Sequence, residues 1–392
     1  MRILLGFKRR AKFSSSDAEV RRAVRKKKRQ ESAPPIKIEQ KRRKKVKFNS
    51  PVDYVAPIWG ADVGIDLGTK NVLIYVKRRG VVLNEPSYVA RYVRSKQIIA
   101  VGEAARVMLG RTPAEIEVIR PIREGVIADY DTTEYMLRYF MERAIGKSSW
   151  IRPRVAVSIP SGVTAVEKRA VVEACLHAGA RKTVLIEEPL AAALGTGLDK
   201  AKSAVAMVVD IGGGTVDIAV VSATGIVVSE SLRLGGDSFD LALVKYFRKR
   251  KKLLVGMNAV EKLKIEVGTV DRRAPLRESF ISGRDLITGL PKTIVATSKD
   301  VQRSLENSVH LIMECVKGIL EKTPPEMVAD IVDHGIILTG GGALIDGFDR
   351  MLTRSTGIAA YLSDEPLYSV VVGTGRALEE MSRLRDVSEE IQ

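Results

Sequence analysis

From about residue 59 onward, short apolar runs alternate with longer amphipathic segments along the chain. The runs are rich in Val and Ile and are bounded by Gly, Pro or Ser, a pattern that predicts β-strands. We expect these strands at residues 63–66, 72–76, 155–159, 184–186, 205–210, 218–221 and 336–339. Segments 133–145 and 163–178 predict helices between them. Strands that alternate with helices indicate an α/β protein whose helices cover the faces of its sheets.

One strand-and-turn pattern occurs twice. Segment 63–71 reads VGIDLGTKN and segment 208–216 reads VVDIGGGTV, and an apolar run follows each turn. In both segments an apolar strand ends in an aspartate, Asp66 or Asp210, followed by one apolar residue and a turn of Gly and Thr. We therefore expect two related halves that face each other and place two hairpins across one cleft.

These two turns suit the phosphates of a nucleotide. Backbone N–H groups approach phosphate oxygens closely where Gly removes the Cβ atom. The turns offer Gly68 and Thr69 on one side, and Gly212, Gly213, Gly214 and Thr215 on the other. An aspartate before each turn fits Mg²⁺, which proteins commonly hold through water. A single turn of this kind is usually structural, but the matched pair predicts a nucleotide triphosphate with Mg²⁺.

A third Gly-rich segment follows the predicted strand at 336–339. Gly340, Gly341 and Gly342 come directly after the strand, and we expect a helix from near Ala343. A Gly-rich turn between a strand and a helix can lie flat against a ribose or a base. Taken alone, this segment fits a nucleotide contact and a simple tight turn equally well.

Composition limits the class of protein. Of the 392 residues 45% are hydrophobic and 28% are charged, which is ordinary for a globular protein of two or more domains. No run reaches the roughly 18 apolar residues of a membrane-spanning helix, and no cleavable leader is recognisable. Cys175 and Cys315 belong to no paired motif, which favours a reducing compartment. We therefore expect a cytoplasmic protein.

The net charge of +17 is concentrated at one end. Residues 1–59 contain 19 Lys and Arg but 5 Asp and Glu, so the remaining chain is nearly balanced. Runs of like charge predict a disordered tail, with attraction to anionic lipid or nucleic acid as the second interpretation. Residues 1–13 mix Ile, Leu and Phe with Arg and Lys, which fits either an amphipathic membrane helix or a disordered end.

The segments IDLGT (65–69), DIGGGT (210–215) and LTGGGA (338–343) resemble the diagnostic motifs of the superfamily of actin, sugar kinases and heat-shock chaperone ATPases. Within it, the chain resembles the bacterial actin family of MreB and its paralogue Mbl. The segments that carry this likeness are LNEPS (83–87), GRTP (110–113), IRPIREGVIAD (119–129), IEEPLAAA (186–193), LVG (254–256) and TPPE (323–326). The resemblance runs from about residue 61 to about residue 378.

This resemblance implies an actin-like two-lobed fold, with two ribonuclease-H-like domains around a nucleotide cleft. The first lobe would span residues 60–200, with a small subdomain at about 84–124. The second would span 201–372, with a small subdomain at about 234–298, and residues 373–392 would return to the first lobe.

The resemblance also implies roles for individual residues with ATP and Mg²⁺. Asp66 and Asp210 would organise the metal, and Glu188 would position the attacking water with help from Thr215. The residues facing the phosphates would be Gly68, Thr69 and Asn71 on one side and Gly212, Gly213, Gly214 and Thr215 on the other. Lys70 is expected at the phosphates because of its position in the first turn, not because of the resemblance. Those near the adenosine would be Glu261, Lys262, Lys264, Gly340, Gly341, Gly342 and Ala343.

Some of these positions also have a structural explanation. Glu187 and Glu188 alternatively fit one surface charge and one helix-capping carboxylate. Glu261 with Lys264 alternatively fits an exposed helix pair worth a few tenths of a kcal/mol. The chain also departs from the family, because Lys70 stands where MreB usually has Ala and Val216 stands where a second Thr is usual. Both departures lie in the phosphate turns, so the rate of ATP hydrolysis is not implied by the resemblance.

The implied function is a weak ATPase that assembles head-to-tail with itself into membrane-associated filaments and directs cell-wall synthesis and rod shape. Its expected partners are the inner face of the cytoplasmic membrane and the membrane proteins of the rod-shape complex. Membrane contact would come from residues 1–13 or from Trp150 and Ile151, although Trp150 equally fits a packed position in the small lobe. The alternatives are a plasmid-segregating filament whose tail binds DNA, a chaperone-type ATPase and a sugar kinase.

Overall fold

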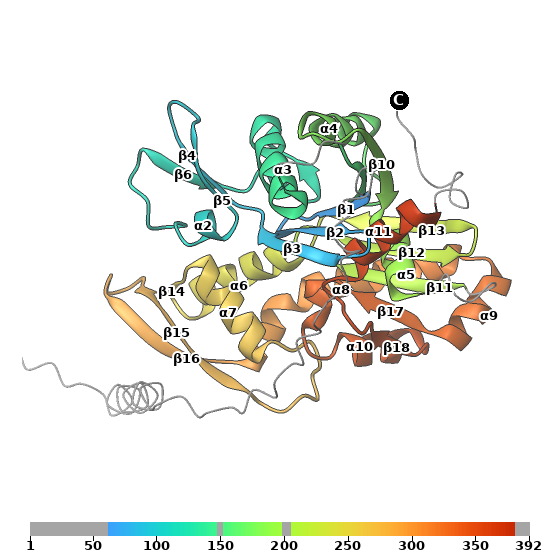
Figure 1. Cartoon of the computed structure of the whole chain (residues 1–392). Coiled ribbons are helices and arrows are strands. Elements are labelled where there is room, and N and C mark those ends of the chain that lie inside the picture. The colour runs from blue at the N-terminus through green and yellow to red at the C-terminus, as the bar shows by residue number, and fades with distance from the viewer. Residues whose placement is uncertain (1–61, 147–151, 198–204, 381–392) are drawn as a thin grey trace, which may run out of the picture.

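The computed structural model describes residues 62–146, 152–197 and 205–380 (Figure 1). The predicted tail at 1–59, the pair Trp150 and Ile151, and the C-terminal residues 381–392 lie outside the described residues. Within the described ranges, no helix combines the length and the apolar character needed to cross a membrane.

The first large sheet contains five strands in the order β10-β9-β1-β2-β3. Strand β1 pairs antiparallel with β2 and parallel with β9. Side chains of Val63 and Ile65 face a core that includes Met136 and Phe140 of helix α3, whereas Gly64 on the other face lies against Gly375 of helix α11. The bounds are β1 Asp62–Leu67, β2 Asn71–Val76, β3 Gly80–Pro86, β9 Arg154–Ile159, β10 Lys182–Glu187, α3 Tyr130–Ile145, α4 Ala165–His177 and α11 Ser369–Glu380.

The second large sheet repeats the plan of the first. Its order is β13-β12-β11-β17-β18, with β11 antiparallel to β12 and parallel to β17. The strand that comes first in the sequence, β1 or β11, is the central strand of its sheet. Two antiparallel strands lie on one side of it and two parallel strands lie on the other. The bounds are β11 Ala206–Ile211, β12 Val216–Ser222, β13 Gly225–Leu232, β17 Ile336–Thr339 and β18 Ala360–Leu362. The predicted strands, helices and internal repetition are therefore confirmed.

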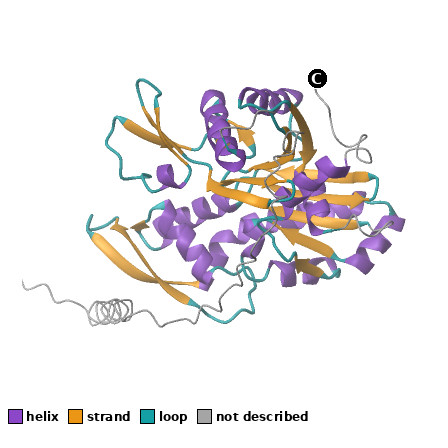
Figure 2. Ribbon diagram, viewed as in Figure 1, coloured by secondary structure: helices purple, strands orange, loops and turns teal. Residues whose placement is uncertain are grey.

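Two helices lie between the large sheets, as Figure 2 shows. Helix α5 (Glu188–Thr196) packs on α11, and together they bury Leu190 and Val370 against Ala206 and Val208 of β11. The opposite face of β11 packs on a separate core beneath helices of the second half. Those helices are α6 Gly236–Arg250, α7 Met257–Val267, α8 Ser298–Lys322, α9 Pro325–His334 and α10 Phe348–Thr356.

Each half also carries a small three-stranded sheet, and both small sheets lie on the same side of the molecule (Figure 1). One sheet is inserted between β3 and α3, with the order β5-β4-β6. The other lies between α6 and α8 in the sequence, with the order β14-β15-β16. Their bounds are β4 Val89–Tyr92, β5 Ile98–Val101, β6 Ile116–Ile119, β14 Leu253–Leu254, β15 Glu278–Asp285 and β16 Pro291–Thr297. Short elements nearby are α2 Glu103–Arg106, β7 Ile122–Arg123 and β8 Val126–Ile127.

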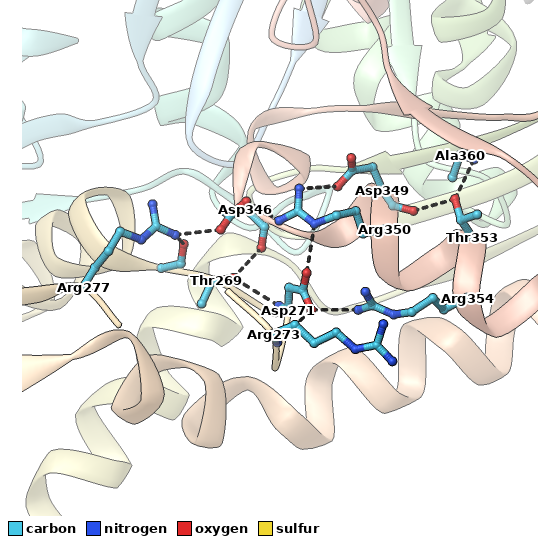
Figure 3. A network of polar contacts seen from close by, with 11 residues as sticks. Thr269, Asp271, Arg273, Arg277, Asp346, Asp349, Arg350, Thr353, Arg354 and Ala360 are labelled. Atoms are coloured by element: carbon cyan, nitrogen blue, oxygen red, sulfur yellow. Dashed lines mark hydrogen bonds and ion pairs between the residues drawn. The ribbon is translucent and has the colours of Figure 1, made fainter. Parts of the chain in front are cut away.

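A network of charged side chains ties α10 to the loop that follows α7 (Figure 3). Asp271 accepts hydrogen bonds from Arg350 Nε and Arg354 Nη2, each at 2.9 Å, and from the backbone N–H of Arg273 at 3.0 Å. Asp346 joins the network through Arg350 at 2.6 Å. These contacts lower the pKa of Asp271, with the backbone N–H of Arg273 as the first cause. The network therefore stabilises this corner of the fold while Asp271 is ionised.

Candidate functional site

The two predicted phosphate turns are brought together in the structure. The β11–β12 turn is closed by a hydrogen bond from the N–H of Gly212 to the carbonyl of Thr215, at 2.9 Å. A Cβ atom on Gly214 would lie 2.4 Å from Thr69 Oγ1 in the β1–β2 turn. Only glycine fits this position, because the turns of the two halves approach each other directly. Thr69 also accepts a hydrogen bond from the N–H of Gly125, at 3.0 Å.

Asp66 is the penultimate residue of strand β1, just before the first turn. Ser158 Oγ, on neighbouring strand β9, donates to Asp66 Oδ1 over 3.5 Å. Burial raises the pKa of Asp66 to about 7, and the charge of Asp210 adds to the rise while Ser158 opposes it. The negative charge of Asp66 is therefore poorly stabilised, because one long hydrogen bond offsets little of the cost of removing the carboxylate from water.

Asp210 occupies the matching place on β11 and is 4% exposed. Thr339 Oγ1, at the end of parallel strand β17, donates to Asp210 Oδ1 at 2.6 Å. Burial raises the pKa of Asp210 to about 6, and the hydrogen bond from Thr339 limits the rise. The two predicted metal-binding carboxylates thus lie on the central strands of the two sheets and influence each other electrostatically.

A third buried carboxylate, Asp217, was missed by the sequence analysis. It lies on β12 and its Oδ1 accepts a hydrogen bond from the N–H of Ser161, at 2.8 Å. Burial raises the pKa of Asp217 to about 7, and its Oδ2 has no hydrogen-bond partner among the described residues. A signal was available in the sequence, because Asp217 interrupts the apolar run between Val216 and Ile218.

Glu188 is the first residue of helix α5 and is 8% exposed. The preceding Glu187 caps the helix, and its carboxylate accepts a hydrogen bond from Ser161 Oγ at 2.6 Å. Burial raises the pKa of Glu188 well above its ordinary value, and the charges of Asp217, Asp66 and Asp210 add to this effect. Glu188 therefore lies in the same electrostatic field as the three aspartates.

This set of carboxylates fits a hard divalent cation. Asp66 and Asp210 carry only oxygen donors, are largely removed from water and have raised pKa values that a positive charge would offset. Among the described residues, no group of three or more His, Cys, Asp or Glu side chains could hold a metal ion. The arrangement suits Mg²⁺, which keeps several waters and binds through one or two carboxylates together with phosphates.

Lys70, predicted to face the phosphates, points across the cleft instead. Its ammonium group lies 2.9 Å from Asp240 Oδ2 and 2.5 Å from Glu261 Oε1. Burial lowers the pKa of Lys70, but these two carboxylates outweigh it and the pKa is raised. Asn71, next in the chain, donates from Nδ2 to Asn84 Oδ1 at 2.6 Å. A direct role of either residue toward a nucleotide stays a prediction.

The residues predicted near the adenosine separate into two groups. Glu261 and Lys264 face the cleft side of α7, where buried Lys264 contacts Asp240 Oδ1 at 2.7 Å and the carbonyl of Gly236 at 3.0 Å. Lys262 lies elsewhere on the helix, is 77% exposed at its side chain and pairs with Glu266 at 3.6 Å. Helical spacing thus brings Glu261 and Lys264 together and leaves Lys262 in solvent.

The third Gly-rich segment adjoins the carboxylates. Gly340 has a φ of 82°, and a Cβ atom there would lie 2.6 Å from Asp210 Oδ1. Gly341, Gly342 and Ala343 belong to a 3₁₀-helix at Gly341–Leu344, whereas the next α-helix, α10, begins at Phe348. The helix expected from near Ala343 is thus a short 3₁₀-helix that begins at Gly341, and the tight turn beside the site is present.

A cavity of about 910 Å³ lies away from this cleft, between α8, α10 and the loop after α7. Its charged lining is largely paired internally, with Arg272 on Glu306 at 2.6 Å and Arg354 on Asp271 at 2.9 Å. None of the predicted site residues lines it. The candidate functional site is therefore the place where the two turns meet, beside Asp66 and Asp210.

Comparison with known proteins gives one consistent result. Residues 60–386 match the sequence model of the family described as MreB/Mbl protein. The chain is 46% identical to the cell shape-determining protein Mbl of Bacillus cereus over 83% of its own length and 98% of that protein. It is 45% identical to the cell shape-determining protein MreB of Escherichia coli K12, over 81% and 93% of the two chains.

Solved structures agree with the sequence relatives. MreB5 of Spiroplasma citri bound to ADP superposes with a TM-score of 0.78 and 34% identity, over 83% of this chain and 98% of that one. The same protein bound to AMPPNP gives the same values. A MamK double helical filament matches with a TM-score of 0.70 at 21% identity, over 82% of this chain and 99% of that one, and supports the fold alone. The predicted actin-like fold is confirmed.

Proposed function

The chain belongs to the MreB/Mbl protein family, and from this premise we propose that it binds ATP with Mg²⁺ in the cleft between its two halves. It hydrolyses ATP slowly, to ADP and phosphate, and assembles into filaments that direct cell-wall synthesis and rod cell shape. We further propose the lobe boundaries predicted above, with the cleft between residues 60–200 and 201–372.

One observation carries the nucleotide proposal. The two Gly/Thr turns of the repeated halves meet at Thr69 and Gly214, directly beside Asp66 and Asp210. Backbone donors on both sides of a triphosphate, next to carboxylates that fit Mg²⁺, form a site in which positioning and charge stabilisation supply most of the catalysis. The Spiroplasma citri relative with ADP or AMPPNP bound supports the same proposal.

Glu188 supplies the proton acceptor in this proposal. Its carboxylate orients a water and takes a proton from it as the terminal phosphate is transferred. Thr215 lies in the second turn and helps to place that water. Asp217 fixes the loop at Ser161, and Ser161 in turn holds Glu187 next to Glu188. Mg²⁺ held by Asp66 and Asp210 would place a positive charge beside these carboxylates, and it would offset the part of the rise in the pKa of Glu188 that their charges cause.

The assembly proposal concerns the molecules that the chain binds when it forms filaments. The chain contacts copies of itself head-to-tail, the inner face of the cytoplasmic membrane and the membrane proteins of the wall-synthesis complex. The net charge of residues 1–59 supports attraction to anionic lipid. Self-assembly is proposed from membership of the MreB/Mbl family, whose relatives include the cell shape-determining proteins Mbl and MreB.

The discriminating experiment combines binding with microscopy. Calorimetric titration with ATP, with and without Mg²⁺, should give Mg²⁺-dependent binding, and electron microscopy on anionic liposomes should then show filaments. Asp210→Asn should weaken Mg²⁺-dependent affinity by about tenfold to a hundredfold, the usual cost of losing a group around a metal. Asp333→Asn, at an exposed position of α9, is the matched control and should change nothing. Binding without any polymer would favour a chaperone-type ATPase or a kinase and contradict the filament proposal.

A further inference from the structure

Six charged side chains form a network that bridges the two halves beside the nucleotide cleft. We call it the cross-cleft network. The first half contributes Lys70 and Arg120, and the second half contributes Asp237, Asp240, Glu261 and Lys264. Three cations thus face three carboxylates, so the network is balanced in charge.

Lys70 is the centre of this network. Its Nζ contacts Asp240 at 2.9 Å, Glu261 at 2.5 Å and Asp237 at 3.5 Å. Arg120 forms a second bridge from the first half to Asp237. Every one of these pairs joins residues more than 100 positions apart in the sequence, so no local element explains them.

Asp240, one partner of Lys70, is buried and paired within its own half. Asp240 is 1% exposed, and Lys264 binds its second oxygen at 2.7 Å. The side chain of Lys70 is itself only 28% exposed, so its ion pairs are screened less than surface pairs are. Charge-assisted hydrogen bonds of this kind are among the strong polar contacts in proteins.

The stem of Lys70 covers the second phosphate turn. A Cβ atom on Gly213 would lie 2.6 Å from Lys70 Cγ and 3.0 Å from its Cβ. Lys70 therefore starts in the first turn, crosses over the second turn and ends on α6 and α7. One side chain thus links both phosphate turns with α6 and α7.

From this geometry we propose that Lys70 is a positioning residue that latches the two halves together across the cleft and so slows the release of bound nucleotide. The inference rests on the proposed nucleotide function. It gives Lys70 a role through Asp240 and Glu261, in place of a direct contact with phosphate. Opening the cleft must break these ion pairs, and nucleotide leaves only when the cleft opens.

The latch itself is tested without nucleotide. Spin labels on Ser95→Cys, in the β4–β5 turn, and on Thr288→Cys, in the β15–β16 turn, report the distance between the two small sheets. The native Cys175 and Cys315 are buried, so the introduced thiols take the labels. Lys70→Met keeps the stem over Gly213 and removes the charge, and it should lengthen and broaden the distance distribution. Lys70→Arg should retain the wild-type distribution.

Nucleotide release is tested by displacing a fluorescent ATP analogue with excess ATP, at protein concentrations where light scattering detects no polymer. Lys70→Met should release the analogue about tenfold faster, the factor that corresponds to losing one charge-assisted hydrogen bond. Raising NaCl from about 0.05 M to about 0.5 M should speed release from the wild type and leave Lys70→Met nearly unchanged. Lys245→Met, at an exposed position of α6, removes the same charge and should behave as the wild type.

A double-mutant cycle separates the latch from a direct phosphate contact. If Lys70 acts through Asp240, which is not among the residues assigned to the nucleotide, then Lys70→Met combined with Asp240→Asn should release nucleotide no faster than Lys70→Met alone. Additive effects, an unchanged distance distribution or an unchanged release rate in Lys70→Met would each overturn the proposal. A wild-type protein that binds no nucleotide would refute the proposed function instead, and the distance measurement would still decide whether the latch exists.

Discussion

Asp210 and Asp217 lie directly opposite each other in the hairpin formed by β11 and β12. Residues paired in this way have Cβ atoms only about 5 Å apart, and like charges at this spacing destabilise a sheet. Thr339 donates to Asp210 and Ser161 donates to Asp217, which offsets part of the cost. Two buried carboxylates on one hairpin destabilise the fold, so folding alone does not explain why both are present. The proposed binding of a cation and of the attacking water does explain them.

The first prediction concerns the influence of Asp217 on Glu188. After burial, the charge of Asp217 is the leading cause of the raised pKa of Glu188. Asp217→Asn removes that charge, so the pKa of Glu188 should fall and the base should stay ionised at lower pH. The acid limb of the pH profile of single-turnover ATP hydrolysis should therefore shift down by about 1 pH unit. Asp131→Asn, at an exposed position near the start of α3, provides the control. A shift to higher pH would contradict the assignment of Glu188 as the base.

The second prediction separates binding from chemistry at Glu188. Glu188→Gln keeps the size of a side chain that is 8% exposed but cannot accept a proton. Hydrolysis should fall by about 10²-fold to 10⁴-fold, the usual contribution of a general base. Affinity for Mg²⁺-ATP should stay within about twofold or increase, because a buried negative charge near the phosphates is removed. Parallel measurements of calorimetric affinity and phosphate release test this, and equal losses in both would refute the catalytic role.

Much of the fold could be predicted from the sequence because its central strands are buried on both faces. Such strands appear as short continuous runs of Val and Ile, and the ends of β17 were predicted without error. The internal repeat was visible because both halves place an aspartate before a Gly-rich turn, at Asp66 and Asp210. Strands of the small sheets, such as β4 and β5, were not predicted because each is only four residues long and mixes buried with half-exposed or exposed positions.

The polar contacts of the site could be predicted less well from the sequence. Helical spacing indicated that Glu261 and Lys264 share a face, but it gave no partner for either. Lys70 was assigned to the phosphates because it follows a phosphate turn in the sequence. Its ion pairs with Asp240 and Glu261 depend on how the two halves pack against each other. Neither the local pattern of apolar residues nor secondary-structure propensity predicts that packing.

The third prediction concerns stability at the network in Figure 3. The contacts of Asp271 lower its pKa, led by the backbone N–H of Arg273. A carboxylate with a lowered folded-state pKa stabilises the protein above its unfolded-state pKa, and this stabilisation is lost as the pH falls through the folded-state value. Asp271→Asn should therefore lower the free energy of unfolding by about 1 kcal/mol at pH 7, since Arg350 and Arg354 are partly exposed and screened.

The pH dependence gives this prediction its test. Urea unfolding should show a constant difference between wild type and Asp271→Asn above about pH 5, and the difference should shrink as the pH falls below about 4. Asp349→Asn removes a carboxylate that lies 3.8 Å from the same Arg350 but is 42% exposed, and it should cost little. A difference between Asp271→Asn and wild type that grows in acid would show that the ionised carboxylate does not stabilise the fold.

The last prediction concerns residues 1–59 and the membrane. These residues contain 19 Lys and Arg against 5 Asp and Glu, whereas the remaining chain is nearly balanced in charge and contains the whole candidate site. A protein that begins at Trp59 should keep its fold and bind ATP, yet sediment less with vesicles that contain anionic lipid.

Each Lys or Arg near such a surface contributes about 1 kcal/mol, and salt screens this attraction. The full-length protein should therefore leave the vesicles progressively as NaCl rises. Replacing Ile3, Leu4 and Leu5 by Ser should remove any salt-resistant fraction, because only apolar insertion survives screening. Neutral vesicles provide the control for charge. Unchanged vesicle binding after truncation would assign the contact to Trp150 and Ile151, and much tighter binding of the full chain to DNA would favour a filament that segregates plasmids.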